Sequence, residues 1–220
     1  MKGALPRFPS RSPVHGLRLV TPLEAGAGGG LVLPGVVLWA LGLNEGDLVA
    51  AEPREGTTGR VNFRGYGERV RRAIEGYSHP WPWVEELLRL PMAAVGPEGT
   101  LALPEEIAGR LALNAPGDLL LSAWTERGSR GFAMERRMDG RRVSPELRAE
   151  ASYTLPVGPD LRIALPADAL WALSLEEETV PLPGLLRASL PLNPESQVTL
   201  VVSLFQQTAS FRLEPCPDLS

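Results

Sequence analysis

Cysteine is almost absent from this chain of 220 residues, since Cys216 is the only one. A single thiol cannot form a disulfide within the chain, which suits a reducing compartment. The segment from Met1 to Pro6 has no apolar run of the signal-peptide type, and no stretch reaches the ~20 apolar residues that a membrane helix needs. We therefore expect a soluble, cytoplasmic protein that does not enter a membrane.

Histidine is nearly as scarce, with only His15 and His79. Neither has a Cys, Asp or Glu at a metal-ligand spacing, and no Gly-x-Ser-x-Gly motif indicates a nucleophile. The glycine-rich run from Gly26 to Gly30 lacks the Gly-Lys-Ser/Thr ending of a phosphate-binding loop, so it predicts a hairpin turn. We expect no catalytic residues, no cofactor and no metal site, and hence a protein that is not an enzyme.

Lysine is also missing apart from Lys2, so the basic charge is almost all arginine. The formal net charge is −4, which gives no overall basic field of the kind that attracts nucleic acid. The arginine bias and the 22 prolines fit a thermophilic source.

One pattern occurs three times: a short apolar strand, a proline, a short helix and a turn into another strand. The prolines are Pro34, Pro104 and Pro166. Proline suits the first helical turn, where its missing N–H costs nothing. Apolar residues four apart, such as Val37 and Leu41, share one face of the following helix. The pattern predicts a mainly β fold with short helices, of the α+β class.

These stretches carry a resemblance to a known family. The pattern Gly-Arg-apolar-x-apolar-Pro, a helix ending in Leu-Gly-Leu, and x-x-Gly-Asp before a strand resembles the AbrB/SpoVT family, which includes the MazE-type antitoxins. The resemblance implies three ββαβ swapped-hairpin repeats that form small β-barrels, each barrel built from two halves. It also implies a DNA-binding transcriptional regulator.

We divide the chain into repeat 1 (17–66), a helical insert (67–89), repeat 2 (90–137), an arginine-rich connector (138–150) and repeat 3 (151–214), which ends in a hairpin. Residues 1–16 are predicted to form a loose arm. A lone half-barrel leaves its strand edges open, so repeats 1 and 2 are expected to pair within the chain. Repeat 3 then needs its copy from a second chain, which predicts a homodimer through repeat 3. Alternatively, the insert or the tail covers repeat 3 in a monomer.

Aromatic residues are expected to anchor the core. Phe63, Phe132 and Phe211 occupy similar places in the three closing strands, and the tryptophans are predicted to pack rather than to stack on bases. These tryptophans are Trp39, Trp81, Trp83 and Trp171.

Arginines are the candidate DNA-binding residues, because their forks suit phosphates. Of the three positions preceding the prolines that the resemblance would assign to DNA, only Arg162 carries an arginine. Two clusters complete the predicted set: Arg60, Arg64, Arg69, Arg71 and Arg72, then Arg136, Arg137, Arg141 and Arg142.

Acidic residues interspersed among these arginines leave a solvated, ion-paired surface as the alternative. The function expected from the resemblance is a non-catalytic regulator that binds double-stranded DNA. The alternative is a protein-interaction or assembly module on the same fold that has lost DNA binding.

Overall fold

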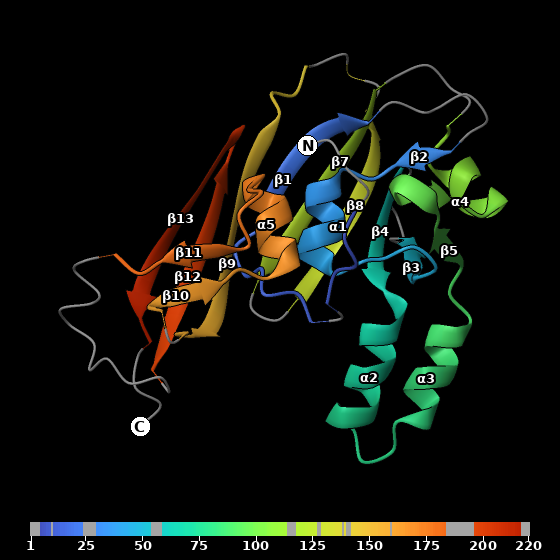
Figure 1. The fold of residues 1–220 in the computed structure, drawn as a ribbon. Helices are drawn as coiled ribbons and strands as arrows, with labels where there is room; N and C mark the ends of the chain where they lie inside the picture. Colours follow the sequence, from blue (N-terminus) through green and yellow to red (C-terminus); the bar gives the residue numbers. More distant parts are fainter. Residues whose placement is uncertain are drawn as a thin grey trace.

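The computed structural model describes residues 5–9, 11–23, 30–53, 59–113, 118–126, 129–137, 139, 142–158, 160–183 and 196–216. Its centre is a curled antiparallel sheet of eleven strands, with a separate two-stranded sheet beside it (Figure 1). The predicted mainly β architecture with short helices is confirmed. Among the described residues no helix is both long and apolar enough to span a bilayer.

Repeats 1 and 2 each supply four strands and one short helix. Repeat 1 contains β1 (Arg18–Leu23), β2 (Leu31–Val32), α1 (Gly35–Leu41), β3 (Leu48–Pro53) and β4 (Arg60–Gly65). Repeat 2 contains β5 (Met92–Val95), a 3-10 turn η1 (Pro97–Gly99), β6 (Thr100–Ala102), α4 (Glu105–Arg110), β7 (Asp118–Glu126) and β8 (Ser129–Arg137). The predicted turn at Gly26–Gly29 lies outside the described residues.

Strands of repeats 1 and 2 pair across the repeat boundary. The first strand of repeat 1, β1, pairs with β7, and the first strand of repeat 2, β5, pairs with β3. Equivalent residues stand opposite each other, since Leu31 faces Leu101 and Phe63 faces Phe132. The two phenyl rings stack at 4.8 Å and are fully buried. The strand pairs of repeats 1 and 2 are therefore arranged with approximate two-fold symmetry.

The link from strand to helix has the same backbone shape three times. Pro34, Pro104 and Pro166 have φ between −61° and −56° and ψ between 138° and 146°. Each helix is followed by a residue at positive φ, namely Gly42, Ala112 or Ser174. The next N–H then bonds back to a helical carbonyl, from Leu43 to Leu38, Leu113 to Ala108 and Leu175 to Leu170. This hydrogen bond is the helix-ending Schellman interaction, here formed with glycine at only one of the three sites.

Repeat 3 is arranged differently. It contains β10 (Arg162–Ala164), α5 (Ala167–Leu173), β11 (Thr179–Pro181), β12 (Gln197–Phe205) and β13 (Thr208–Pro215), and its first strand β9 spans Glu146–Pro156. Residues 146–150, predicted to end the connector, thus belong to a strand. β9 pairs with β12 of its own repeat over nine residues, while β10 pairs with β11 in the separate sheet. The hairpin predicted around Gln206 is present.

Two predictions about packing are wrong. The arm is not loose where it is described, because Phe8 and Val14 are buried and Val14 bridges to Ala151 of β9. The Phe8 N–H also donates to Asn44 Oδ1 at 2.6 Å. Phe211 is not a buried anchor like its counterparts, since it is 40% exposed on the last strand of the sheet.

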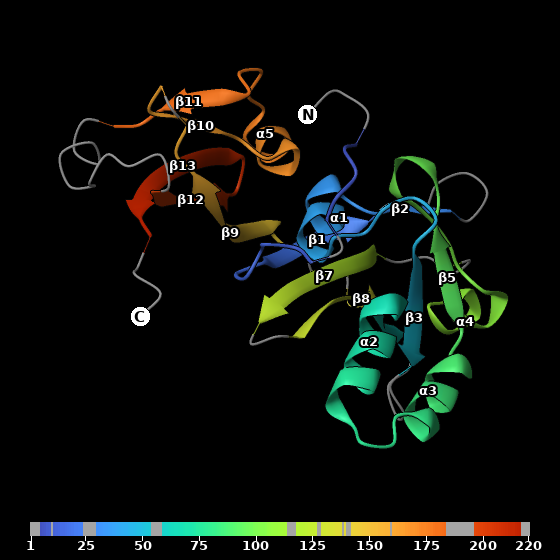
Figure 2. The same cartoon turned by 60° about the horizontal axis from the view of Figure 1, so that its bottom comes forward.

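The helical insert forms a pair of helices, α2 (Tyr66–Gly76) and α3 (Trp81–Leu88). It projects beyond the sheet in both Figure 1 and Figure 2. Its own small core consists of Ala73, Val84 and Leu87. Trp81 and Trp83 are exposed, so the prediction that all four tryptophans anchor the core is wrong for these two. Trp39 is fully buried, whereas Trp171 is partly buried and meets Phe8 edge to face at 5.3 Å.

Candidate functional site

The first arginine cluster converges where the helical insert meets the sheet. Arg64 comes from β4, while Arg69 and Arg72 come from α2. Together with Arg130 of β8 they line a hollow of about 640 Å³ between α2, α3 and the sheet. Tyr77 and Trp83 stack at 5.0 Å and form part of its wall. The structure thus brings together three of the predicted arginines, and adds Arg130.

Carboxylates form ion pairs with this cluster. Glu52 accepts ion pairs from Arg64, at 3.7 Å, and from Arg69. Glu68 pairs with Arg72 at 2.5 Å and with Arg130, whose side chain is only 13% exposed. Burial lowers the pKa of the Arg69 guanidinium, an effect that the charge of Glu86 opposes. The hollow therefore holds an ionic network in which four arginines share the carboxylates of Glu52 and Glu68, with Glu86 as a third acidic residue in its wall.

The remaining predicted arginines lie apart from this hollow. Arg60 pairs with Glu135 at 3.4 Å, Arg71 lies 4.0 Å from Glu75, and Arg137 pairs with Asp139 at 2.5 Å. Arg136 donates to the carbonyls of Ala112 and Leu113, just after α4. Arg142 is exposed in the segment before β9, and Arg141 lies outside the described residues.

Arg162 has a structural role within the small sheet. Its Nε donates to Thr179 Oγ1 and its terminal nitrogen to the Thr179 carbonyl, each at 3.0 Å. At the corresponding turn of repeat 2, between β5 and β6, the chain carries the acidic Glu98 and no arginine. The ten predicted DNA-binding residues therefore do not form one continuous basic surface among the described residues.

A buried polar network that the sequence did not reveal joins repeat 1 to repeat 3. Asp168 is 5% exposed, and the Tyr153 hydroxyl donates to its Oδ2 at 3.0 Å. The indole N–H of Trp39 donates to the same hydroxyl at 3.3 Å. Burial, reinforced by the charge of Asp168, raises the pKa of Tyr153 above its ordinary value.

Tyr153 and Asp168 also line a second hollow, of about 960 Å³, beside the arm. Both residues belong to repeat 3, but they are 15 positions apart, in β9 and α5, and no spacing in the sequence indicates that their side chains meet. Among the described residues no three His, Cys, Asp or Glu side chains are placed to hold a metal ion.

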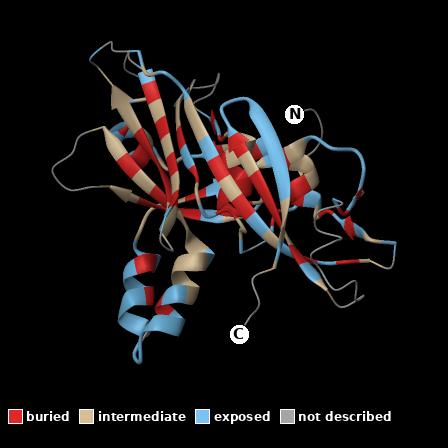
Figure 3. Ribbon diagram, turned by 90° about the vertical axis from the view of Figure 1, so that its left-hand side faces the viewer, coloured by how far each residue is buried: buried red, intermediate tan, exposed pale blue. Residues whose placement is uncertain are grey.

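The two edge strands of the large sheet differ in the length of backbone that they leave unpaired. One end is β2, which has two residues and is followed by Pro34. The other end is β13, which has eight residues and pairs only with β12 among the described strands. β13 is the strand nearest the viewer in Figure 3, where most of its length is exposed. A long free edge exposes a row of backbone N–H and C=O groups that can pair with another strand.

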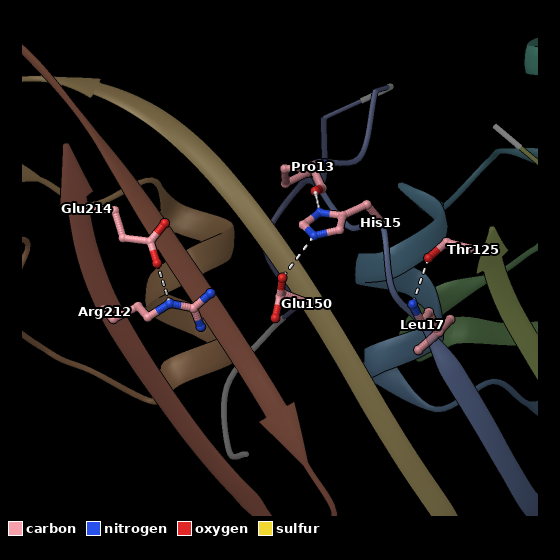
Figure 4. A network of polar contacts seen from close by, with 7 residues as sticks. All are labelled: Pro13, His15, Leu17, Thr125, Glu150, Arg212 and Glu214. Atoms are coloured by element: carbon pink, nitrogen blue, oxygen red, sulfur yellow. Dashed lines mark hydrogen bonds and ion pairs between the residues drawn. The ribbon is translucent and has the colours of Figure 1, made fainter. Parts of the chain in front are cut away.

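Polar contacts hold the neighbouring part of the sheet in place (Figure 4). His15 of the arm lies 3.1 Å from Glu150 of β9, and the Leu17 N–H donates to Thr125 Oγ1 at 2.7 Å. On β13 itself, Arg212 Nε donates to Glu214 Oε1 at 2.6 Å. This hydrogen bond raises the pKa of Arg212.

No protein-family model, curated protein or solved structure matches the chain.

Proposed function

We propose that the protein is a non-catalytic assembly module on an AbrB-like swapped-hairpin fold, and that its partner is a second copy of the chain. Two features of the structure support this proposal. Strands of repeats 1 and 2 pair with each other and, at β1, with β9 of repeat 3, whereas repeat 3 ends the sheet with the open edge of β13.

The swapped-hairpin part of the proposal is supported by the strand order. β1 pairs with β7 and β5 with β3, so each repeat gives its first strand to the other. The closing strands β4 and β8 pair in the middle, and β2 pairs with β6. An exchange of equivalent strands between two halves is the arrangement that the resemblance implies. It removes the open edges that either half would have alone.

The assembly part is carried by one observation, the free edge of β13. The pairing of first strands across repeats 1 and 2 has no counterpart in repeat 3, whose first strand pairs with its own β12. Repeat 3 therefore needs no exchanged strand from a second chain. What it leaves open is the outer edge of β13, the strand that carries the exposed Phe211. Homodimerisation through repeat 3 remains our proposal, but through the edge of the sheet.

The charges weigh toward assembly and against DNA binding. Six of the predicted arginines already pair with carboxylates: Arg60, Arg64, Arg69, Arg71, Arg72 and Arg137. These pairs reduce the positive charge that the surface offers to a DNA backbone, whose binding depends on neutralised phosphates. DNA binding stays a prediction that follows from the family resemblance, and these ion pairs do not favour it.

The mass of the purified protein from light scattering, together with a DNA-binding assay, distinguishes an assembly module from a DNA-binding regulator. We expect a mass of twice 23.7 kDa, a ratio of absorbance at 260 to 280 nm typical of protein alone, and no retardation of genomic DNA fragments at low salt. A monomer at all micromolar concentrations would refute the assembly proposal. Salt-sensitive retardation of DNA would favour the regulator instead, because each phosphate contact steepens the salt dependence.

A further inference from the structure

The free edge strand carries enough sequence information to specify its own partner. We propose that two copies of the chain join β13 to β13 in antiparallel fashion, with Leu213 opposite Leu213 and Arg212 opposite Glu214 of the second copy. This inference rests on the proposed self-assembly and adds the strand, its register and the residues that specify it.

The faces of the strand limit the possible registers. Leu213 packs against the core, whereas Arg212 and Glu214 point to the opposite, solvent-exposed face, because side chains alternate along a strand. A two-fold axis perpendicular to the sheet keeps both core faces on the same side. Residues that stand opposite each other across the axis must then belong to the same face. Only registers centred on one residue meet this condition, and those nearest the middle are centred on Ser210, Phe211, Arg212 or Leu213. Centring on Ser210 sets Arg212 against Thr208 and forms no ion pair, which leaves the registers centred on Phe211, Arg212 and Leu213.

Charge distinguishes these three registers. Centring on Arg212 sets two guanidinium groups directly against each other, and like charges at such positions are destabilising. Centring on Phe211 sets Arg212 against Ser210 and gains no ion pair. Centring on Leu213 sets Arg212 against Glu214 twice, once on each side of the axis, and opposite charges there stabilise the pair.

The same register also covers apolar surface. On the core face it sets Phe211, which is 40% exposed, opposite Pro215 of the second copy. Arg212 and Glu214 are themselves accessible, with side chains 54% and 46% exposed. Edge strands that avoid pairing are often blunted by charged side chains and by proline. β13 has both, since Pro215 ends it, but its two charges are of opposite sign and two residues apart, a sequence that is complementary to itself when antiparallel.

The proposal predicts a charge-reversal pattern in light scattering or sedimentation velocity. Arg212→Glu alone and Glu214→Arg alone should each raise the dimer dissociation constant at least about tenfold, because two attractive pairs become two repulsive ones. An equimolar mixture of these two variants should recover the dimer as a heterodimer. The double variant R212E/E214R should also dimerise, since its charges are again complementary.

Two controls test the position of the contact. Arg148→Glu reverses a charge on the same outward face but on β9, two strands from the edge, and should leave the dimer unchanged. Trp81→Glu alters the exposed helical insert and should have no effect either. Far-ultraviolet circular dichroism confirms that each variant is folded, which is expected for substitutions at exposed sites.

The outcomes separate this inference from the proposed function. If the wild-type protein dimerises but neither single reversal weakens the dimer, the β13 register is refuted and self-assembly stands. Dissociation by Trp81→Glu alone would move the interface to the helical insert, and likewise refute the register. A wild-type protein that stays monomeric refutes both.

Discussion

Repeats 1 and 2 on the one hand and repeat 3 on the other use the same local motif and reach different strand pairings. In all three a proline precedes a short helix that ends in a left-handed residue. The first strands of repeats 1 and 2 pair with strands of the other repeat, whereas the first strand of repeat 3 pairs with its own β12 and with β1. The turn-helix-turn is set by nearby residues, while strand pairing depends on which partner is within reach. The difference shows that similar local sequences specify the same proline–helix–turn segment but do not determine which strands pair.

The two regions also bury equivalent residues to different extents. The tripeptide Trp-Ala-Leu ends both α1 and α5. Trp39 is fully enclosed between repeats 1 and 3, while Trp171 remains partly exposed beside Phe8 and Gly35. The equivalent helices α1 and α5 thus differ in burial, although all three repeats contribute buried residues to one core.

The largest expected difference is between these two tryptophans. Trp39→Ala should lower the free energy of unfolding by about 3–5 kcal/mol, because it removes a fully buried ring and the donor to Tyr153. Trp171→Ala should cost clearly less, since part of that ring is in solvent. Urea denaturation followed by circular dichroism measures both. Trp81→Ala, at a 72% exposed site, is the control and should change little. Equal losses at Trp39 and Trp171 would show that the two helices are equally buried.

A second comparison uses the closing strands. Phe132→Ala should cost about 3–5 kcal/mol, because the ring is fully buried and stacked on Phe63. Phe211→Ala should cost less than about 1 kcal/mol in a monomer, given its exposure. A double-mutant cycle of Phe63 and Phe132 should give a coupling of about 0.5–1.5 kcal/mol. Zero coupling would contradict direct contact between repeats 1 and 2 at these residues.

The sequence predicted what short-range rules decide. Proline at the start of each helix, the helical insert and the hairpin at Gln206–Gln207 follow from spacing within a few residues. It did not predict that Ala112 and Ser174 adopt positive φ as Gly42 does. At those sites the Schellman hydrogen bond offsets a conformation that alanine and serine do not prefer.

The failures concern contacts between distant segments. Burial of Phe8 and Val14 depends on α1 and β9, which no local pattern of the arm encodes. The arginine clusters were defined by proximity along the chain, but the partners of these arginines include Glu135, which is 75 positions from Arg60. The exposure of Trp81 and Trp83 follows from the outward projection of the insert. Composition alone does not distinguish such a projection from a packed helix pair.

The polar network between repeats 1 and 3 gives a pH-dependent test. The folded state raises the pKa of Tyr153, so its phenol stays protonated at pH values where the unfolded chain ionises. This contribution is fully present below the ordinary tyrosine pKa of about 10 and is lost as the pH rises above it. The wild type should therefore lose up to about 1.4 kcal/mol per pH unit more than Tyr153→Phe above that point.

Urea titrations of both proteins between neutral and alkaline pH provide this measurement. At neutral pH the variant should itself be less stable by about 1–3 kcal/mol, because Asp168 loses a donor in a buried site. Parallel pH profiles for the two proteins would mean that Tyr153 ionises as readily in the folded chain as in the unfolded one.

The smallest expected effects concern the residues that end the three helices. Ala112→Gly and Ser174→Gly should each stabilise the protein by up to about 1 kcal/mol, because glycine adopts positive φ without the steric cost that a Cβ adds. Gly42→Ala should have the opposite sign, since its φ is 64° and a Cβ there would lie 2.5 Å from the Pro9 carbonyl oxygen. Thermal unfolding of the three variants measures the sign directly. If glycine destabilises at Ala112 or Ser174, the helix ends of repeats 2 and 3 differ in backbone from that of repeat 1, and the shared motif is confined to a single repeat.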